Sequence, residues 1–559
     1  MVKPGEGTDL GGAGAPRRRA QELALLSPFE LKSELLARAE HAAGRTGGHV
    51  LDAGRGNPNW VATTPREALF LLGRFAVQEA KRAWAGVDLA GMIERAGIAE
   101  RLRLFLSVHG TEPGAELLGG SLDYGVDRGF DPDAWAYELA GGVMGDHYPG
   151  PDRMLVHAEK VVHDYLVAEV SDELGAAGPF DLFAVEGGTA AMCYVFDSLA
   201  TNLVLRHGDR VAIMVPAFTP YLEIPKLDRY GFDVVTVNAS AVDGQGSHTW
   251  QAPDAELDKL ADPSVKALFV INPSNPPSVM LAGESVSRLS AIVASANPDL
   301  VIVTDDVYGT FVDDFRSLLA ELPRNVIGVY SFSKYFGCTG WRLGVVALHV
   351  DNVVDRLLTQ LPAGDQQALN RRYRSLSVDP ASIKFIDRMV ADSRQVALNH
   401  TAGLSLPQQV QMTLFATFAL IDTADDYKAR TRSLLDARLE RLYQALGVPL
   451  PDDPLRAGYY AEVDLLDWAH RRSGPDFASW LDAVHQPIDL LFQLADAHHV
   501  VLLHGGGFDG PRWSVRVSLA NLRLEAYGEI GTALRTVFEG YLTEYQTEDL
   551  GRPTHRSSD

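Results

Sequence analysis

Residues 331–344 place one lysine, one arginine and two serines in a glycine-containing turn directly after an apolar run. The lysine, Lys334, is a candidate nucleophile that forms an imine with an aldehyde cofactor such as pyridoxal phosphate. The hydroxyls of Ser331 and Ser333 and the planar guanidinium of Arg342 suit a phosphate group with several anionic oxygens. A surface turn with solvated basic residues is the alternative, and the neighbouring segments argue against it.

Four further segments follow apolar runs, and each supplies a group that a pyridine ring could use. Glu186-Gly-Gly-Thr-Ala190 is a turn that opens a helix and could receive a phosphate on backbone N–H groups. Asp305 could keep the ring nitrogen protonated, because a nearby carboxylate favours the cationic form. Tyr308 and Asn275 could contact the ring O3′ oxygen, and Phe218 could stack on the ring face. Each residue alone also fits a helix cap, a turn or the core.

The elements that must position these residues are short β-branched runs separated by stretches of helical length. The runs cover residues 181–185, 211–215, 233–237, 267–271, 300–304, 326–330 and 343–348. This pattern predicts an α/β fold with a mostly parallel sheet, in which ligands bind beyond the carboxyl ends of the strands. We therefore predict that the candidate residues meet at one edge of one sheet. Either Asp305 or Asp306 could face the ring, and the three-residue step to Tyr308 favours Asp305.

Composition limits the classes of partner. The chain has 559 residues, enough for two or more domains, and its 50 Lys and Arg against 73 Asp and Glu give a formal charge of −23. This charge argues against nucleic acid or anionic membrane as partners, so an anionic substrate needs local cations. The only cysteines, Cys193 and Cys338, predict neither a disulfide framework nor a metal site. Apolar runs stay below the roughly 20 residues of a membrane span. We expect a cytoplasmic protein.

These motifs resemble those of the pyridoxal phosphate-dependent aminotransferases with the aspartate aminotransferase fold, over most of residues 52–521. The resemblance implies fold type I, with a large domain built on a seven-stranded sheet, a smaller α+β domain and pyridoxal 5′-phosphate as cofactor. It implies that Lys334 is the lysine joined to the cofactor, that Asp305 is the pyridinium partner, and that Tyr308 and Asn275 contact O3′. It assigns the phosphate cup to Gly187, Gly188, Thr189, Ser331 and Arg342.

The same resemblance implies contacts beyond the cofactor ring. Arg516 is similar to the arginine that holds the substrate α-carboxylate, and Tyr148 to the tyrosine that reaches a phosphate across a dimer interface. Arg55 is a candidate for orienting the side-chain carboxylate, weighed equally against a surface role. Lys32 is a weaker second candidate, for which an exposed helix face is the stronger interpretation. The usual Asn-Pro-Thr-Gly motif reads Asn275-Pro-Pro-Ser278 here, which predicts a shifted backbone in that loop.

The chain is longer than an ordinary member of that superfamily, and the additional residues fall in two places. The predicted organisation has a flexible tail (1–20), a segment that contributes to the small domain and active site (21–60), a helical insertion (61–145), the cofactor-binding large domain (146–420), the C-terminal small domain (421–546, with an insertion at 464–498) and a second tail (547–559). Additions without catalytic spacing favour assembly surfaces, so we expect oligomer contacts there.

The length, together with residues 51–60 and 186–192, resembles the L-aspartate 4-decarboxylases, which retain aminotransferase activity and assemble as dimers and multiples of dimers, up to dodecamers. The resemblance implies conversion of L-aspartate to L-alanine and CO2 through aldimine, ketimine and enamine intermediates. The alternative is an ordinary aspartate or aromatic aminotransferase that uses 2-oxoglutarate. A lyase acting on S-adenosylmethionine and a transcription regulator with an aminotransferase-like domain are weaker alternatives.

Overall fold

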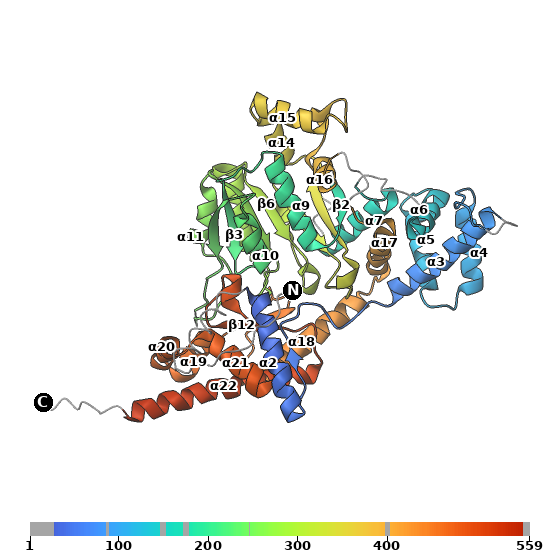
Figure 1. Ribbon diagram of the computed structural model, residues 1–559. Helices are drawn as coiled ribbons and strands as arrows, with labels where there is room; N and C mark the ends of the chain where they lie inside the picture. The colour runs from blue at the N-terminus through green and yellow to red at the C-terminus, as the bar shows by residue number, and fades with distance from the viewer. Residues whose placement is uncertain are drawn as a thin grey trace, which may run out of the picture. The chain divides into compact units, whose positions relative to one another are not determined.

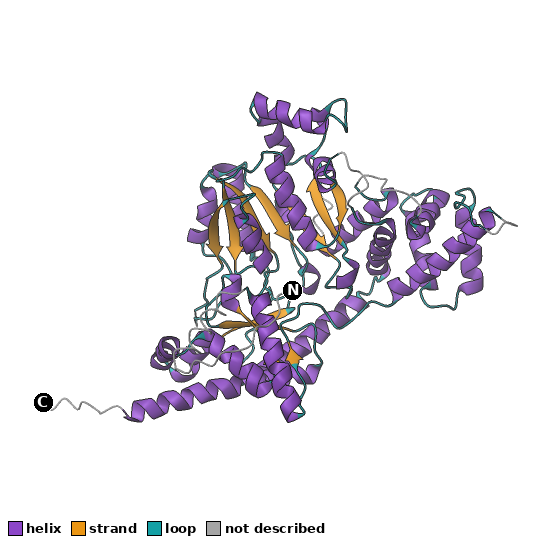
Figure 2. Cartoon of the chain, viewed as in Figure 1, coloured by secondary structure: helices purple, strands orange, loops and turns teal. Residues whose placement is uncertain are grey.

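The computed structural model describes residues 27–84, 89–145, 153–170, 178–244, 246–396 and 403–551 (Figures 1 and 2). The chain divides into two compact units. The larger unit comprises Asn57–Asp436 and Asp452–Tyr459, and the smaller unit comprises Met1–Gly56, Ala437–Pro451 and Tyr460–Asp559. Within the described residues, no helix combines the length and apolar character needed to cross a membrane.

A seven-stranded sheet forms the centre of the larger unit. Its strands are β2 (Phe180–Val185), β3 (Arg210–Val215), β4 (Asp233–Asn238), β5 (Val265–Ile271), β6 (Val301–Asp305), β7 (Val326–Ser331) and β8 (Gly344–His349). The strand order is β2-β8-β7-β6-β5-β3-β4, and β8 alone runs antiparallel to both of its neighbours. The predicted fold class, a mostly parallel seven-stranded sheet, is therefore confirmed.

Burial explains why these runs form the central strands. Every residue of β6, β7 and β8 is buried, as expected for strands covered by helices on both faces. The α-helices that follow residue 150 in the larger unit, apart from α18, are α7 (Val156–Val170), α9 (Gly188–Thr201), α10 (Thr219–Glu223), α11 (Asp254–Leu257), α12 (Gly283–Ala291), α13 (Leu318–Glu321), α14 (Val353–Gln360), α15 (Ala363–Tyr373), α16 (Phe385–Ser393) and α17 (Leu406–Ile421). Helix α9 packs against β2, β7 and β8.

A group of four helices precedes the sheet in sequence and packs together and against α17. They are α3 (Thr64–Ala83), α4 (Ile98–His109), α5 (Ala115–Asp127) and α6 (Pro132–Met144). Helices α3 and α4 lie side by side, because the rings of Phe75 and Phe105 are 5.5 Å apart and Arg101 forms a 2.7 Å ion pair with Glu79. These helices lie within the predicted insertion at 61–145, whose boundaries stay a prediction.

The smaller unit combines helices with short strands. Strands β9 (Tyr460–Asp464), β11 (Leu503–His504) and β12 (Ser514–Ser518) form an antiparallel sheet, and β1 (Leu51–Asp52) pairs in parallel with β10 (Val500–Val501). Its helices are α2 (Pro28–Thr46), α19 (Leu465–Ser473), α20 (Pro475–Val484), α21 (Pro487–His498) and α22 (Leu524–Gly551), while α18 (Asp426–Leu446) begins in the larger unit and ends here. Helix α22 extends into residues 547–551, which the sequence analysis assigned to a tail.

Candidate active site

The carboxyl ends of β5, β6 and β7 carry predicted site residues to one place, which we call the cofactor edge: Asn275, Asp305, Ser331 and Lys334. Because the three strands are parallel neighbours, the residues that end them or follow them lie at the same end of the sheet. The start of α9 reaches the same place, since a Cβ atom added at Gly188 would lie 3.6 Å from Ser331 Cβ and 3.7 Å from Asp305 Oδ2.

Asp305 is buried at the end of β6 and is held by two donors. Tyr221 Oη donates a 2.6 Å hydrogen bond to its Oδ2, and the backbone N–H of Val307 donates one of 3.2 Å to its Oδ1. Burial raises the pKa of Asp305, while the hydrogen bonds and the charge of Lys334 lower it. A cationic ring nitrogen beside this carboxylate would favour its ionised form further.

The neighbouring Asp306 has a separate set of partners. The hydroxyls of Thr304 and Ser317 donate hydrogen bonds to its two carboxylate oxygens, and burial raises its pKa to about 7. Of the two aspartates that the sequence left open, Asp305 is the one that lies with Gly188, Ser331 and the charge of Lys334.

Arg342 and the turn after β2 form a cradle for an anion. The Arg342 guanidinium donates hydrogen bonds of 2.9 Å to the Glu186 carbonyl and 3.0 Å to the Thr339 carbonyl. Gly187 has a φ of 92°, and a Cβ atom there would lie 2.7 Å from Arg342 Nη2. Helix α9 begins at Gly188 without a capping side chain, so its first N–H groups suit an anion.

The hydroxyls predicted for the phosphate cup lie close to each other. Ser331 Oγ is 2.9 Å from Ser333 Oγ and 3.3 Å from the Leu343 carbonyl, and both serine side chains are buried. Thr189 is the second residue of α9. Together with Arg342, these groups fit the phosphate of pyridoxal phosphate, and Asp305 fits its ring nitrogen.

Aromatic residues surround the nucleophile candidate. Lys334 Nζ is 5.8 Å from the centre of the Tyr459 ring, which packs at 5.0 Å against Tyr308. Asn275 Nδ2 is 3.4 Å from Tyr308 Oη, so the two predicted O3′ contacts are neighbours. Phe218 is half-buried, and its ring centre is 5.6 Å from that of Tyr221.

Tyr221 and Tyr459 are not among the residues that the sequence predicts for the site. Tyr221 lies one helical turn after Phe218. Its position in the segment 216–221 was the only signal in the sequence that could have placed it near the site. Tyr459 lies in a segment with no motif, and only the fold brings it to Lys334.

In the smaller unit, Arg516 is almost completely buried on β12. It donates a 3.1 Å hydrogen bond to the Gly54 carbonyl, and its guanidinium lies 4.4 Å from the ring centre of Tyr460. Glu462 on β9 is its direct partner in the strand ladder, so both side chains lie on the same face of the sheet. The arginine is thus fixed in place by its own unit.

Residues 52–55, which we call the arginine turn, begin at the last residue of β1. Lys32 Nζ forms a 3.0 Å ion pair with Asp52 Oδ2, and Asp52 Oδ1 accepts a 3.1 Å hydrogen bond from the Gly54 N–H. Lys32 is therefore largely buried in an ion pair, which corrects the interpretation that it lies on an exposed helix face. Arg55 is exposed and makes no ion pair with any residue that the structure describes. Tyr148 lies outside the described residues.

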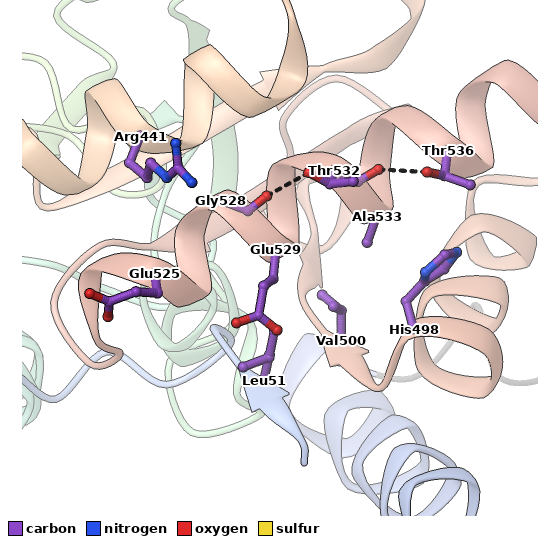
Figure 3. Close-up of a pocket in the computed structure, with 10 residues that line it drawn as sticks. All are labelled: Leu51, Arg441, His498, Val500, Glu525, Gly528, Glu529, Thr532, Ala533 and Thr536. Carbon is purple, nitrogen blue, oxygen red and sulfur yellow. Dashed lines mark hydrogen bonds between the residues drawn. The ribbon is translucent and has the colours of Figure 1, made fainter. Parts of the chain in front are cut away.

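A separate open pocket of about 490 Å³ lies in the smaller unit (Figure 3). Thr532 and Thr536 lie along one side, on α22, and their hydroxyls bond to backbone carbonyls of the same helix. The lining residues are Leu51, Arg441, His498, Val500, Glu525, Gly528, Glu529, Thr532, Ala533 and Thr536. None of the predicted site residues lines this pocket.

Comparison with known proteins identifies the family. The model of the family "Aminotransferase class I and II" matches residues 184–534, more than half of the chain. A bifunctional aspartate aminotransferase and L-aspartate beta-decarboxylase from a Pseudomonas species is 50% identical over 531 residues, which cover 94% of this chain and 98% of that protein. An aspartate aminotransferase from Sulfolobus acidocaldarius is 31% identical over 28% of this chain and 39% of its own length.

Solved structures support the same fold. Bna3p, a putative kynurenine aminotransferase from Saccharomyces cerevisiae, has a TM-score of 0.56 at 16% identity, covering 95% of this chain and 100% of that one. A mutant aspartate aminotransferase from Thermus thermophilus has a TM-score of 0.55 at 16% identity, covering 93% and 98%. The chain belongs to the class I and II aminotransferase family. It is an enzyme, and its cofactor is pyridoxal phosphate.

Proposed function

We propose that this enzyme converts L-aspartate to L-alanine and CO2, with aspartate aminotransferase as a side activity. The 50% identity to the bifunctional relative extends over 94% of the chain, well beyond the 351 residues from 184 to 534 that the family model matches. The observation that carries the chemistry is the buried Asp305 carboxylate beside Lys334.

Pyridoxal phosphate, when bound, supplies an acceptor for the electrons released at the reacting carbons of the substrate. Arg342 and the first turn of α9 would hold its phosphate, and Asp305 would keep its ring nitrogen protonated. Tyr221 keeps Asp305 oriented through the 2.6 Å hydrogen bond. Tyr308 and Asn275 would contact its O3′ oxygen, and Phe218 would stack on its ring.

Lys334 performs the proton transfers in this proposal. Its amine removes the proton from the substrate α-carbon and returns a proton at the end of the cycle, which requires a mobile side chain near the reacting atoms. Lys334 is half-buried rather than enclosed, and its Nζ lies 5.8 Å from the centre of the Tyr459 ring.

The two substrate carboxylates need two different cations. We assign the α-carboxylate to Arg516, because a rigidly held guanidinium suits bidentate recognition. We assign the side-chain carboxylate to Arg55, whose exposed side chain would hold it less tightly. A tight bidentate contact would stabilise that carboxylate in the ground state and oppose loss of CO2. Lys32 would then support the arginine turn through Asp52 rather than bind substrate directly.

The test is incubation of the enzyme with aspartate and pyridoxal phosphate without any keto acid, while alanine and CO2 are followed together. Equal appearance of both supports the decarboxylase. Oxaloacetate formation that depends on 2-oxoglutarate, without CO2, would support the ordinary aminotransferase.

Self-association is part of the proposal, as a homodimer or a multiple of it up to a dodecamer. The α3 and α4 pair exposes large apolar side chains: Phe70 is 64% exposed, Leu104 67% and Val108 73%. Exposed apolar side chains of this size favour contact with another protein surface. Light scattering on Leu104→Asp would show a smaller assembly if this face joins subunits, and an unchanged mass would exclude it.

We also propose a cytoplasmic location. The two cysteines, both within the described residues, form no disulfide, which fits a reducing compartment.

A further inference from the structure

Ser278 occupies the position where the family motif has glycine, and its backbone requires what glycine provides. Its φ is 64°, a left-handed conformation that residues with a side chain adopt at a cost, and it is completely buried. Glycine would fit this position without that cost. The serine side chain must therefore offset the cost by a contact that glycine lacks.

That contact is to residues 452–459, the segment of the larger unit that follows α18 in sequence. Ser278 Oγ accepts a 3.1 Å hydrogen bond from the Tyr459 N–H, and the Ser278 carbonyl accepts one of 2.7 Å from the Ala457 N–H. The Met280 N–H donates to the Leu455 carbonyl at 2.8 Å. The loop after β5 thus holds this segment at three points, and one of them needs the serine hydroxyl.

The held segment ends in Tyr459, which is completely buried among other rings. Its ring centre lies 6.1 Å from that of Trp60, 5.2 Å from that of Phe311 and 5.0 Å from that of Tyr308. The same ring lies 5.8 Å from Lys334 Nζ, within the range in which an aromatic face attracts a cation. The tyrosine ring therefore packs against three aromatic rings and also lies close to the Lys334 amine.

We infer that Ser278 and Tyr459 form a positioning pair: the serine hydroxyl fixes Tyr459, and the Tyr459 ring stabilises positive charge on the Lys334 nitrogen. The inference rests on the proposed role of Lys334 in the site. It explains why this chain keeps a serine in a conformation that favours glycine. Tyr459 is a positioning residue for Lys334, and it is not assigned a proton transfer.

The first experiment uses the protein without cofactor and follows amide hydrogen exchange at single residues by mass spectrometry. In Ser278→Gly the Tyr459 amide loses its acceptor and should exchange about tenfold faster, while the Ala457 amide keeps the residue 278 carbonyl. Ser274→Ala removes another hydroxyl from the same loop and should leave the Tyr459 amide unchanged. Equal exchange of Tyr459 in wild type and Ser278→Gly would overturn the role of the serine.

The second experiment follows the pH at which the visible absorption of bound pyridoxal phosphate changes. Removing the ring in Tyr459→Leu should lower this midpoint by about half a pH unit, because no aromatic ring then stabilises positive charge on the lysine nitrogen. Tyr459→Phe keeps the ring and should keep the midpoint, and Ser278→Gly should lower it. Asp305 and Tyr308, the titratable neighbours, are the same in all variants. An unchanged midpoint in Tyr459→Leu would overturn the inference.

Borohydride reduction of the wild-type enzyme, followed by peptide mapping, separates this inference from the proposed function. Labelling at a residue other than Lys334 refutes the proposed site, whatever the variants do. Labelling at Lys334 with unchanged exchange and midpoints refutes the positioning pair alone.

Discussion

Asp305 and Ser331 at the cofactor edge are buried at the ends of strands, whereas Arg55 in the arginine turn is exposed after a strand of two residues. At the cofactor edge, hydrogen bonds and a covered sheet fix each group. In the arginine turn, the ion pair between Lys32 and Asp52 and hydrogen bonds to the backbone of residues 52–54 hold the main chain, while the Arg55 side chain is exposed. If Arg55 binds the side-chain carboxylate as proposed, the groups for the cofactor are held rigidly and the contact to the departing carboxylate is loose.

The largest effect is expected at Lys334. Lys334→Ala should lower turnover by at least about 10⁴-fold, because it removes both the cofactor bond and the group that transfers protons. The visible absorption band of the bound cofactor should disappear. Normal turnover with a surviving band would refute the assignment of the cofactor edge.

Asp305 and Asp306 form a matched pair at the same strand end. Asp305→Asn should lower kcat by roughly 10²-fold or more, because the ring nitrogen loses its carboxylate. Asp306→Asn should keep kcat within a few-fold, since its partners are Thr304 and Ser317. If steady-state kinetics show a larger loss of kcat in Asp306→Asn than in Asp305→Asn, the roles of the two aspartates are the reverse of those proposed.

Asp306 also predicts a pH dependence of stability. Its pKa of about 7 in the folded protein lies above the ordinary value of 3.8, so the folded state binds a proton that the unfolded state releases. Its stabilising contribution is complete below about pH 4 and is lost as the pH rises to about 7. Thermal unfolding of Asp306→Asn should lack this decline relative to the wild type between these pH values. Parallel pH curves for both proteins would contradict it.

Arg516→Lys tests the proposed role of a buried arginine of the smaller unit. The variant keeps the charge but loses the bidentate fork, and we expect kcat/KM for aspartate to fall roughly 10²-fold. Circular dichroism is the control for folding, because the residue is buried. A loss of kcat/KM below threefold would remove Arg516 from substrate binding.

The smallest effect is expected at Arg55. Arg55→Ala should lower kcat/KM by about tenfold and change the ratio of alanine to oxaloacetate, because the side-chain carboxylate loses its orienting cation. Arg45→Ala, a second exposed arginine of the smaller unit, serves as the control. Unchanged rates of both products in Arg55→Ala would leave the arginine turn without a catalytic role.

The sheet and the cofactor edge could be predicted because each residue follows a strand whose apolar pattern is visible in the sequence. Asp305 and Lys334 lie at the ends of such runs, so their order along the chain implied their meeting. Tyr221 and Tyr459 could not be assigned in this way, since their roles depend on contacts with Asp305 and Lys334 that only the fold creates. The ion pair of Lys32 with Asp52 could not be predicted for the same reason. The helical pattern shows on which face of the helix Lys32 lies, but it does not show which residue packs against that face.

The smaller unit is made of three separate stretches of chain, and the larger unit of two. Arg516 lies in the last of these stretches, and its hydrogen-bond acceptor, Gly54, lies in the first. During synthesis on the ribosome, the first stretch must therefore wait for nearly the whole polypeptide to emerge before it can complete its fold. For the same reason, no single crossover between two genes could exchange the smaller unit of this enzyme as an intact module.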